Sequence, residues 1–262
     1  MDYETMLFDF DGAFARLTLN RPERLNSFNL AMHAEVSDAL DRLEAADSLR
    51  VLLITGAGRG FCAGQDLSDR SVAADDDVDL GASLEDRYNP LIRRLTRLPA
   101  PVICAVNGVA AGAGANLAFA ADIVLAARSA KFIQSFANIG LVPDSGGTWI
   151  LPRALGLPRA MALALTGQPL TAEQAESWGL IWKAVDDGDL QAEAETLGRR
   201  FSVAPTRGLA ATKLALRHAF ETSLDRQLDV ERDQQRALGH SADYREGVAA
   251  FLEKRPAAFT GA

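Results

Sequence analysis

Residues 61–67 read FCAGQDL and residues 107–116 read NGVAAGAGAN, and these two glycine–alanine turns decide the fold of the chain. Each follows a short strand-like run, VLLIT at 51–55 and PVICAV at 101–106, and each leads into a segment that can form a helix. A turn of small residues between a strand and a helix leaves backbone N–H groups that no side chain shields. Two such turns brought together would hold one oxygen atom from both sides, as enzymes do to stabilise an enolate or a tetrahedral oxyanion.

Several further segments resemble, in the same order, those of the enoyl-CoA hydratase/isomerase family, the crotonase-like proteins. They are LTLNRPERLNSF at 17–28, PDSGGT at 143–148, LTAEQA at 170–175 followed by WGL at 178–180, and EGVAAFLEKR at 246–255. The resemblance covers nearly the whole chain. It implies an α/β fold, the crotonase-like spiral of repeated β-β-α units with a C-terminal all-helical appendage. It does not fix the reaction, because this fold hosts several chemistries.

The residues themselves predict the same class of fold. Alternating residues at 5–10 and 14–20, around Asp11-Gly12, predict an antiparallel hairpin, and Asn29 is the expected N-cap of the first helix. Strand, turn and helix then recur before residue 165, which predicts an α/β core. Beyond Pro205 the pattern is helical to the end. We therefore expect residues 1–200 to form the core with the CoA-binding and active site, and residues 201–262 a helical segment for trimerisation and for closing the site.

Composition limits the classes of function. The 262 residues are 48% hydrophobic and carry a net charge of −8, which favours a globular core and argues against general nucleic-acid binding. Two cysteines, Cys62 and Cys104, are too few for a disulfide framework or a zinc site, so both are expected to be reduced and buried. No secretory signal and no membrane span are visible, so we expect a cytoplasmic protein with no membrane or nucleic-acid partner.

The segment from Ser68 to Asp86 is strongly acidic and poor in apolar residues. Among its carboxylates are Asp75, Asp76 and Asp77. A solvated loop is the expected interpretation. A mobile cover over the neighbouring Gly64–Gln65 turn is the second choice.

The family resemblance assigns the two oxyanion-hole donors to the backbone N–H groups of Gln65 and Ala113. Two amides that hold a thioester carbonyl would acidify the protons on the adjacent carbon by stabilising the enolate. Ala113 stands where many family members have glycine. Alanine keeps its N–H group, so the oxyanion hole is expected to survive.

The two glutamates that act in hydratases of this family are missing. The resemblance places them at Asn116 and Phe136, and neither an amide nor a phenyl ring takes up a proton at neutral pH. Hydration by that mechanism is therefore disfavoured. Asn116 is expected to orient a substrate group or a water, or else to serve packing alone.

Asp144 remains as the candidate acid–base residue. It stands where some isomerases and a dehalogenase of the family carry aspartate. One carboxylate can remove a proton from one carbon and return it at another, which moves a double bond. The alternative is structural: an aspartate before Ser-Gly-Gly-Thr would cap a helix that begins near Thr148.

The resemblance also implies a path for the CoA group. Arg24 and Ala63 match positions that line this path, and Phe136 belongs to the expected aromatic wall. Phe251 and Lys254 match positions that reach the path from a neighbouring subunit. We expect a homotrimer or a dimer of trimers, an acyl-CoA as the small-molecule substrate, and no metal or cofactor beyond the CoA of that substrate.

Finer likenesses point to one branch of the family. NRPERLNSFN at 20–29, GRGFCAGQDL at 58–67, YNP at 88–90, PDSGGTW at 143–149 and SADYREG at 241–247 resemble isomerases that convert a ring epoxide of phenylacetyl-CoA into an oxepin-CoA in phenylacetate catabolism. The alternatives are a Δ3,Δ2-enoyl-CoA isomerase of fatty-acid oxidation, an enoyl-CoA hydratase, and a non-catalytic acyl-CoA-binding or RNA-binding member of the fold.

Overall fold

The computed structural model describes residues 3–69 and 79–262. The predicted hairpin is present: β1 (Met6–Phe10) pairs antiparallel with β2 (Phe14–Leu19). At its turn, Gly12 has φ +94°, and the carboxylate of Asp11 accepts from the amides of Ala13 and Phe14 at 3.1 and 2.8 Å. An aspartate that bonds the backbone ahead of it, with a glycine free to take positive φ, makes this turn tight.

The other strands lie in two sheets. They are β3 (Val51–Gly56), β4 (Gly60–Cys62), β5 (Val102–Val106), β6 (Val109–Ala111), β7 (Ile123–Ala127), β8 (Lys131–Ile133), β9 (Leu170–Thr171) and β10 (Lys183–Val185). The six-stranded sheet has the order β1-β2-β3-β5-β7-β10 and the four-stranded sheet the order β4-β6-β8-β9. Each successive pair, β3 with β4, β5 with β6 and β7 with β8, gives one strand to each sheet. This arrangement confirms the predicted spiral of repeated units.

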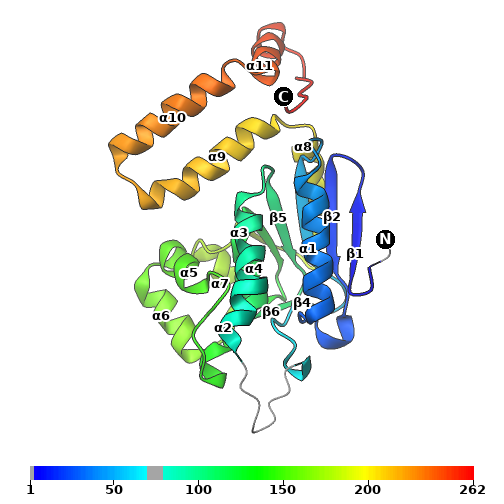
Figure 1. Ribbon diagram of the computed structural model, residues 1–262, viewed down its shortest axis with the longest axis vertical. Helices are drawn as coiled ribbons and strands as arrows, with labels where there is room; N and C mark the ends of the chain where they lie inside the picture. The colour runs from blue at the N-terminus through cyan, green and yellow to red at the C-terminus, as the bar shows by residue number, and fades with distance from the viewer. Residues whose placement is uncertain (1–2, 70–78) are drawn as a thin grey trace.

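Helices pack around these sheets and, at the C-terminus, extend beyond them (Figure 1). They are α1 (Leu30–Glu44), α2 (Leu80–Ser83), α3 (Asn89–Arg97), α4 (Ala113–Ala120), α5 (Gly147–Leu155), α6 (Leu157–Thr166), α7 (Ala172–Ser177), α8 (Leu190–Ser202), α9 (Thr206–His218), α10 (Leu224–Leu238) and α11 (Ala242–Glu253). The short helices are η1 (Pro22–Arg24), η2 (Leu67–Asp69), η3 (Leu84–Tyr88, a π-helix), η4 (Ser135–Ile139) and η5 (Ala219–Glu221). The predicted cap of α1 is confirmed, since the Asn29 side chain accepts from the amide of Met32 at 2.8 Å.

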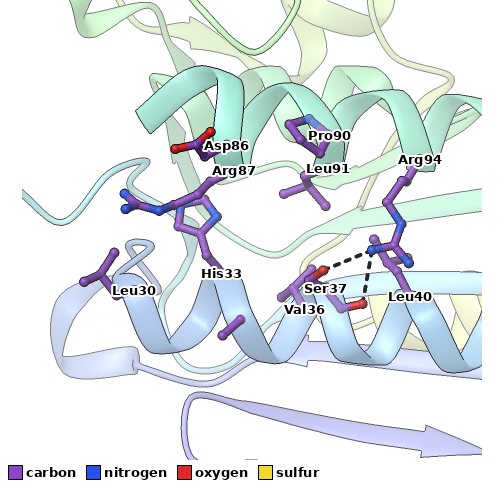
Figure 2. A pocket seen from close by; sticks show the side chains of 11 residues that line it. Leu30, His33, Val36, Ser37, Leu40, Asp86, Arg87, Pro90, Leu91 and Arg94 are labelled. Atoms are coloured by element: carbon purple, nitrogen blue, oxygen red, sulfur yellow. Dashed lines mark hydrogen bonds between the residues drawn. The ribbon is translucent and has the colours of Figure 1, made fainter. Parts of the chain in front are cut away.

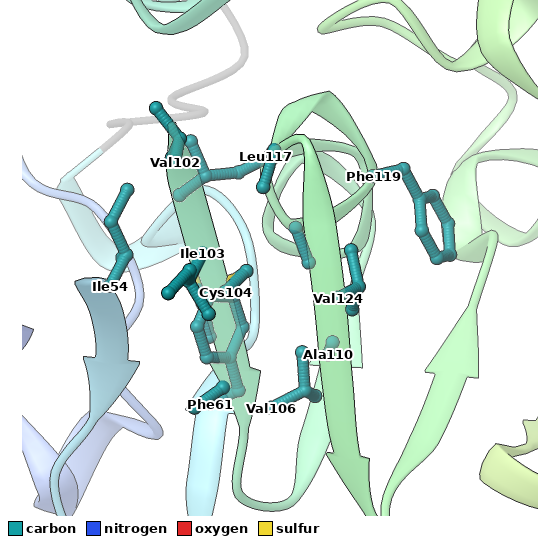
Figure 3. Close-up of a cluster of buried hydrophobic side chains, with 14 of the residues drawn as sticks. Ile54, Phe61, Val102, Ile103, Cys104, Val106, Ala110, Leu117, Phe119 and Val124 are labelled. Carbon is teal, nitrogen blue, oxygen red and sulfur yellow. The ribbon is translucent and has the colours of Figure 1, made fainter. Parts of the chain in front are cut away.

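The core lies between the sheets and the helices packed on them, and the part between the sheets and α4 is shown in Figure 3. Every residue of β5 is buried, and Leu117 of α4 is also buried. Cys62 and Cys104 are free and buried, as expected. A strand that is apolar along its whole length is typical of a parallel sheet covered on both faces.

The C-terminal segment is helical, as predicted, and α9, α10 and α11 extend to one end of the molecule (Figure 1). One buried cluster joins α9 to the core. The Lys213 ammonium contacts Asp122 at 2.8 Å and donates to the carbonyls of Leu95 and Ala100, while Arg217 also pairs with Asp122 at 2.9 Å. The C-terminal arm, meaning α9, α10 and α11, is therefore attached to the core by ion pairs of Lys213 and Arg217 with Asp122.

Part of the acidic segment is ordered as helix. Asp79 caps α2 by accepting from the amide of Ala82 at 3.0 Å, and α2 continues into η3. Asp75, Asp76 and Asp77 lie outside the described residues, as does the whole of 70–78, so the structure does not test the interpretation of this segment as a mobile cover. Within the described part of the chain, no helix combines the length and the apolar character needed to cross a bilayer.

Candidate functional site

The two glycine–alanine turns meet in space. A Cβ atom built on Gly64 would lie 2.9 Å from the carbonyl oxygen of Ala111 and 3.3 Å from the amide nitrogen of Ala113. A Cβ atom on Gly114 would lie 2.3 Å from the carbonyl oxygen of Cys62. Bare backbone at both glycines is what allows this approach. The turn after β4 and the turn after β6 therefore form one structural unit.

Both expected donors belong to this unit. Around Gln65 the chain makes an isolated parallel bridge with Phe28: the amide of Phe28 donates to the carbonyl of Gly64 at 2.7 Å, and the amide of Asp66 donates to the carbonyl of Phe28 at 2.8 Å. In this bridge Phe28 bonds to the residues before and after Gln65. The N–H of Gln65 itself therefore points away from Phe28. Ala113 is the first residue of α4, where an amide has no earlier helical carbonyl to bond.

A buried ion pair braces the first turn. The guanidinium of Arg21 donates to Asp66 at 2.8 Å and to the carbonyl of Ser27 at 2.6 Å. The hydroxyl of Ser68 also donates to Asp66, and together the Ser68 and Arg21 contacts hold the pKa of the Asp66 carboxyl below its usual value. Because Asp66 stays ionised and paired, its position is fixed, and so is the backbone of its neighbour Gln65.

Asp144 lies in the loop before α5, and its carboxylate does not serve as the predicted helix cap. The helix begins at Gly147, its N-cap is Gly146, and no side chain caps it. The backbone carbonyl of Asp144, not its side chain, accepts from the amide of Gly147 at 2.8 Å. The hydroxyl of Ser145 donates to the Asp144 carboxylate at 2.9 Å. Asp144 is therefore not the N-cap residue of α5, and its acid–base role stays a prediction.

Asn116 connects this loop to the second turn, because it lies one helical turn beyond Ala113 on α4. Its side chain is fully buried, donates to the Asp144 carbonyl at 2.8 Å, and accepts from the Gln134 amide at 2.9 Å. Both polar ends of the side chain are thus bound to the protein. Of the two expected roles, these bonds fit the one within the protein, and a contact with a substrate group or a water stays a prediction.

Phe136 lies on η4 beside the second turn. Its ring is buried and would lie 3.7 Å from a Cβ atom on Gly112. Gln65, Ala113, Asn116, Phe136 and Asp144 are therefore brought into one region, although they come from four separate parts of the chain.

The expected CoA-path residues fall into two groups. Arg24 is exposed. Ala63 belongs to the first turn, and its amide donates to the carbonyl of Leu25 at 2.9 Å, so Arg24, the residue before Leu25, lies beside this turn. Phe251, which is 82% exposed, and Lys254 lie at the far end of the molecule, on and just after α11 (Figure 1). Within one chain they do not join the other site residues.

Two cavities lie near the site. A cavity of about 270 Å³ between α1 and α3 is lined by His33, Arg87 and Arg94, and Arg94 donates to Ser37 there (Figure 2). A larger one of about 620 Å³ lies between α3, α5 and α9, and its lining includes Gly146 and Trp149 of the loop and helix after Asp144. The predicted catalytic residues line neither of these cavities.

Sequence reasoning missed four supporting residues: Arg21, Tyr88, Gln134 and Ser145. The hydroxyl of Tyr88 donates to the Gln65 side chain at 3.0 Å from η3. The bonds from Arg21 to Asp66, from Tyr88 to Gln65 and from Gln134 to Asn116 join segments that the fold brings together, so no local spacing shows them, whereas Ser145 bonds its immediate neighbour Asp144. No group of three or more metal-ligating side chains occurs within residues 3–69 and 79–262.

Comparison with known proteins gives a consistent result. The family model described as enoyl-CoA hydratase/isomerase matches residues 9–262. The chain is 58% identical to the 1,2-epoxyphenylacetyl-CoA isomerase of Escherichia coli strain K12 over 98% of this chain and 99% of that protein. It is 46% identical to a probable enoyl-CoA hydratase of Rhodobacter capsulatus over the full length of both. The crystal structure of a putative enoyl-CoA hydratase from Streptomyces coelicolor superposes with a TM-score of 0.92 at 34% identity, covering 100% of this chain and 96% of that one.

Proposed function

The chain belongs to the enoyl-CoA hydratase/isomerase family, and on that basis we propose that it is an isomerase acting on CoA thioesters, with Asp144 as its proton shuttle. The observation that carries the proposal is the meeting of the two turns. The amides of Gln65 and Ala113 therefore belong to one structural unit. The loop of Asp144 is connected to this unit by the hydrogen bond from Asn116 of α4.

The proposed reaction moves a double bond without a net gain or loss of atoms. The carboxylate of Asp144 removes a proton from the carbon next to the thioester carbonyl of a 3-enoyl-CoA. The electron pair of that C–H bond moves towards the carbonyl, and the amides of Gln65 and Ala113 stabilise the negative charge on its oxygen. The protonated Asp144 then returns the proton to the fourth carbon, which leaves a conjugated 2-enoyl-CoA and a regenerated carboxylate.

For the natural substrate we propose a ring-1,2-epoxide of phenylacetyl-CoA, converted to an oxepin-CoA. The support is the 58% identity to the Escherichia coli isomerase of that name. The carbon–carbon bond shared by the epoxide and the ring breaks, and the ring expands. Asp144 moves a proton from the carbon beside the thioester to a ring carbon, so this reaction is also an isomerisation. A place in phenylacetate catabolism follows from that substrate.

The rest of the site is proposed from the same frame. Arg24 and Ala63 line the CoA path, Phe136 forms part of the wall around the acyl group, and Phe251 and Lys254 reach the path from a neighbouring subunit. The assembly is a homotrimer or a dimer of trimers in the cytoplasm. No cofactor beyond the CoA of the substrate is required by the chemistry above.

The test follows the absorbance of the conjugated thioester when purified protein is mixed with trans-3-hexenoyl-CoA. We expect turnover by the wild type and a loss of roughly 10²–10⁴-fold in Asp144→Asn, because the amide takes up no proton. A parallel assay with the ring epoxide compares the two substrates through kcat/KM. Full activity in Asp144→Asn would refute the proposed mechanism.

The hydratase and binding alternatives have their own readouts. Addition of water to a 2-enoyl-CoA removes the absorbance of the conjugated thioester. We expect no such loss of absorbance, because Asn116 and Phe136 replace the acidic residues of hydratases. A wild type that binds acyl-CoA or RNA without turning over either thioester would favour the non-catalytic alternative.

A further inference from the structure

The backbone carbonyl of Asp144 is held from two sides. It accepts from the amide of Gly147 and from the side-chain amide of Asn116, both at 2.8 Å. A carbonyl oxygen has two lone pairs, so both are used. The peptide plane that follows Asp144 is therefore fixed, and with it the direction in which the Asp144 side chain leaves the backbone.

The direction of the amides in this chain of bonds is determined by chemistry. A carbonyl only accepts, so Asn116 must present its Nδ2 to Asp144 and its Oδ1 to the other side. Gln134 must then donate its Nε2 to that oxygen, at 2.9 Å. The Oε1 of Gln134 is left buried with no hydrogen-bond partner among the described residues. The donor-to-acceptor order from Gln134 through Asn116 to Asp144 is therefore fixed by the chemistry of the three groups.

The loop is built around this contact. A Cβ atom on Gly147 would lie 2.4 Å from the Nδ2 of Asn116, so only glycine leaves room for the amide. Ser145 takes φ +49° and Gly146 takes φ +83°, and the buried Ser145 hydroxyl donates to the Asp144 carboxylate. A serine in the left-handed region persists only where its surroundings hold it there.

Asn116 also stands on the helix that begins with Ala113. The amide of Asn116 donates to the carbonyl of Gly112 at 3.2 Å, so a single helical turn separates the proposed oxyanion donor from the side chain that holds Asp144. The spacing between the donor and the acid–base residue is thus set by one rigid element and one hydrogen bond.

We propose that Asn116 and Gln134 are positioning residues, a buried amide relay that fixes Asp144 relative to the Ala113 amide. The inference rests on the proposed function and goes beyond it. It gives Asn116, which stands where hydratases carry a glutamate, the role of holding Asp144 in place. The relay does not touch the substrate, since Asn116 is fully buried and both of its polar atoms are bound to the protein.

The sharpest test replaces Asn116 with a group of the same shape. A protonated aspartic acid can donate to the Asp144 carbonyl and accept from Gln134, whereas an ionised one only accepts. In Asn116→Asp we therefore expect kcat to fall as the pH rises through the ionisation of residue 116, a decline that wild type lacks. The structure shows Asn116 bonded to Gly112, Gln134 and Asp144, and of these only Asp144 has a titratable side chain. The pH profile of wild-type kcat already contains the titration of Asp144, so the comparison with wild type separates it from that of residue 116.

Asn116→Leu is the matched control, because it keeps the size and removes both bonds. We expect its kcat to be lower by roughly 10–100-fold at every pH with KM within about twofold of wild type, as for a displaced acid–base group. Gln134→Glu, which also loses its donor on ionisation, repeats the pH test if Asn116→Asp does not fold.

Two outcomes would overturn the inference. One is a kcat within about twofold of wild type in Asn116→Leu, and the other is a rise in KM at unchanged kcat, which would place Asn116 against the substrate. Asp144→Asn, measured beside them, separates the two proposals. Activity in that variant refutes the proposed function, whereas its inactivity combined with an active Asn116→Leu refutes the relay alone.

Discussion

Gly64 lies at the contact between the two turns, with φ +90°. In Gly64→Ala the added methyl would meet the carbonyl of Ala111 at 2.9 Å, so the turns must separate. We expect a loss of stability of about 1–2 kcal/mol from the left-handed backbone alone. We also expect a fall in kcat on the order of 10²-fold, the effect of losing one oxyanion donor. Thermal melting and the hexenoyl-CoA assay measure the two effects.

Gly208 provides the comparison for this prediction, because it lies in α9 and a Cβ atom added there would meet no heavy atom within 4 Å. Gly208→Ala should leave kcat unchanged and stabilise the helix by roughly 0.5–1 kcal/mol. Equal loss of activity in both variants would show that the contact at Gly64 has no special role.

Cys62 shows what burial does to a single thiol. Burial raises the pKa of Cys62 to about 12, and it raises the pKa of Cys104 as well. The reactive thiolate is therefore suppressed at both positions. In the native protein at about pH 8 we expect no labelling by a thiol reagent on the timescale of the assay, and labelling of both cysteines after denaturation. Rapid labelling of the native protein would show that the core around β4 and β5 opens readily.

At the scale of elements, Asp122 connects α9 to the sheet. It pairs with Lys213 and Arg217 and accepts from the amide of Val102 at 2.9 Å. Asp122→Ala leaves the buried Lys213 without its counter-charge, so we expect a loss of about 3–5 kcal/mol in the free energy of unfolding. Asp233→Ala on the surface of α10 breaks exposed pairs and should cost less than about 1 kcal/mol. Denaturant titration of both variants measures the difference.

The same cluster predicts a pH dependence. Desolvation lowers the pKa of Lys213 from 10.5, and Asp122 opposes this shift. The unfolded chain therefore binds that proton more readily, and stability rises with pH in the window between the folded pKa and 10.5. Removing Asp122 lowers the folded pKa of Lys213 further, so the window then begins at a lower pH. As the pH rises through this window towards 10.5, Asp122→Ala should regain stability relative to wild type. A constant difference between the two proteins would contradict this.

How far the sequence predicts these elements depends on the range of the interactions. The hairpin, the cap at Asn29 and the C-terminal helices follow from local patterns, and the structure confirms them. The bonds from Asn116 to Asp144 and from Tyr88 to Gln65 join residues 28 and 23 positions apart. No local periodicity encodes such pairs, because they depend on which turns the fold stacks together.

At the scale of the molecule, the C-terminal arm has apolar side chains that the single chain leaves uncovered. Leu224 is 74% exposed, Phe251 is 82% exposed and Leu252 is 73% exposed. If neighbouring subunits cover this arm, as we propose, Phe251→Asp should shift the protein towards smaller species in sedimentation velocity. It should also raise KM for the acyl-CoA. Leu7→Ala, at an exposed position of β1, is the control and should change neither. An unchanged assembly in Phe251→Asp would place the subunit contact elsewhere.

The order of the six-stranded sheet, β1-β2-β3-β5-β7-β10, is also the order in which those strands leave the ribosome. Each new strand adds to the edge that the previous one left open, and the partner strands of the second sheet follow in step. The nascent chain can therefore assemble its core from the N-terminus onward, without waiting for a distant strand to insert between two others. At any moment of synthesis this sheet exposes only its β1 edge and its growing edge to mispairing, and no gap between paired strands has to wait for a later one.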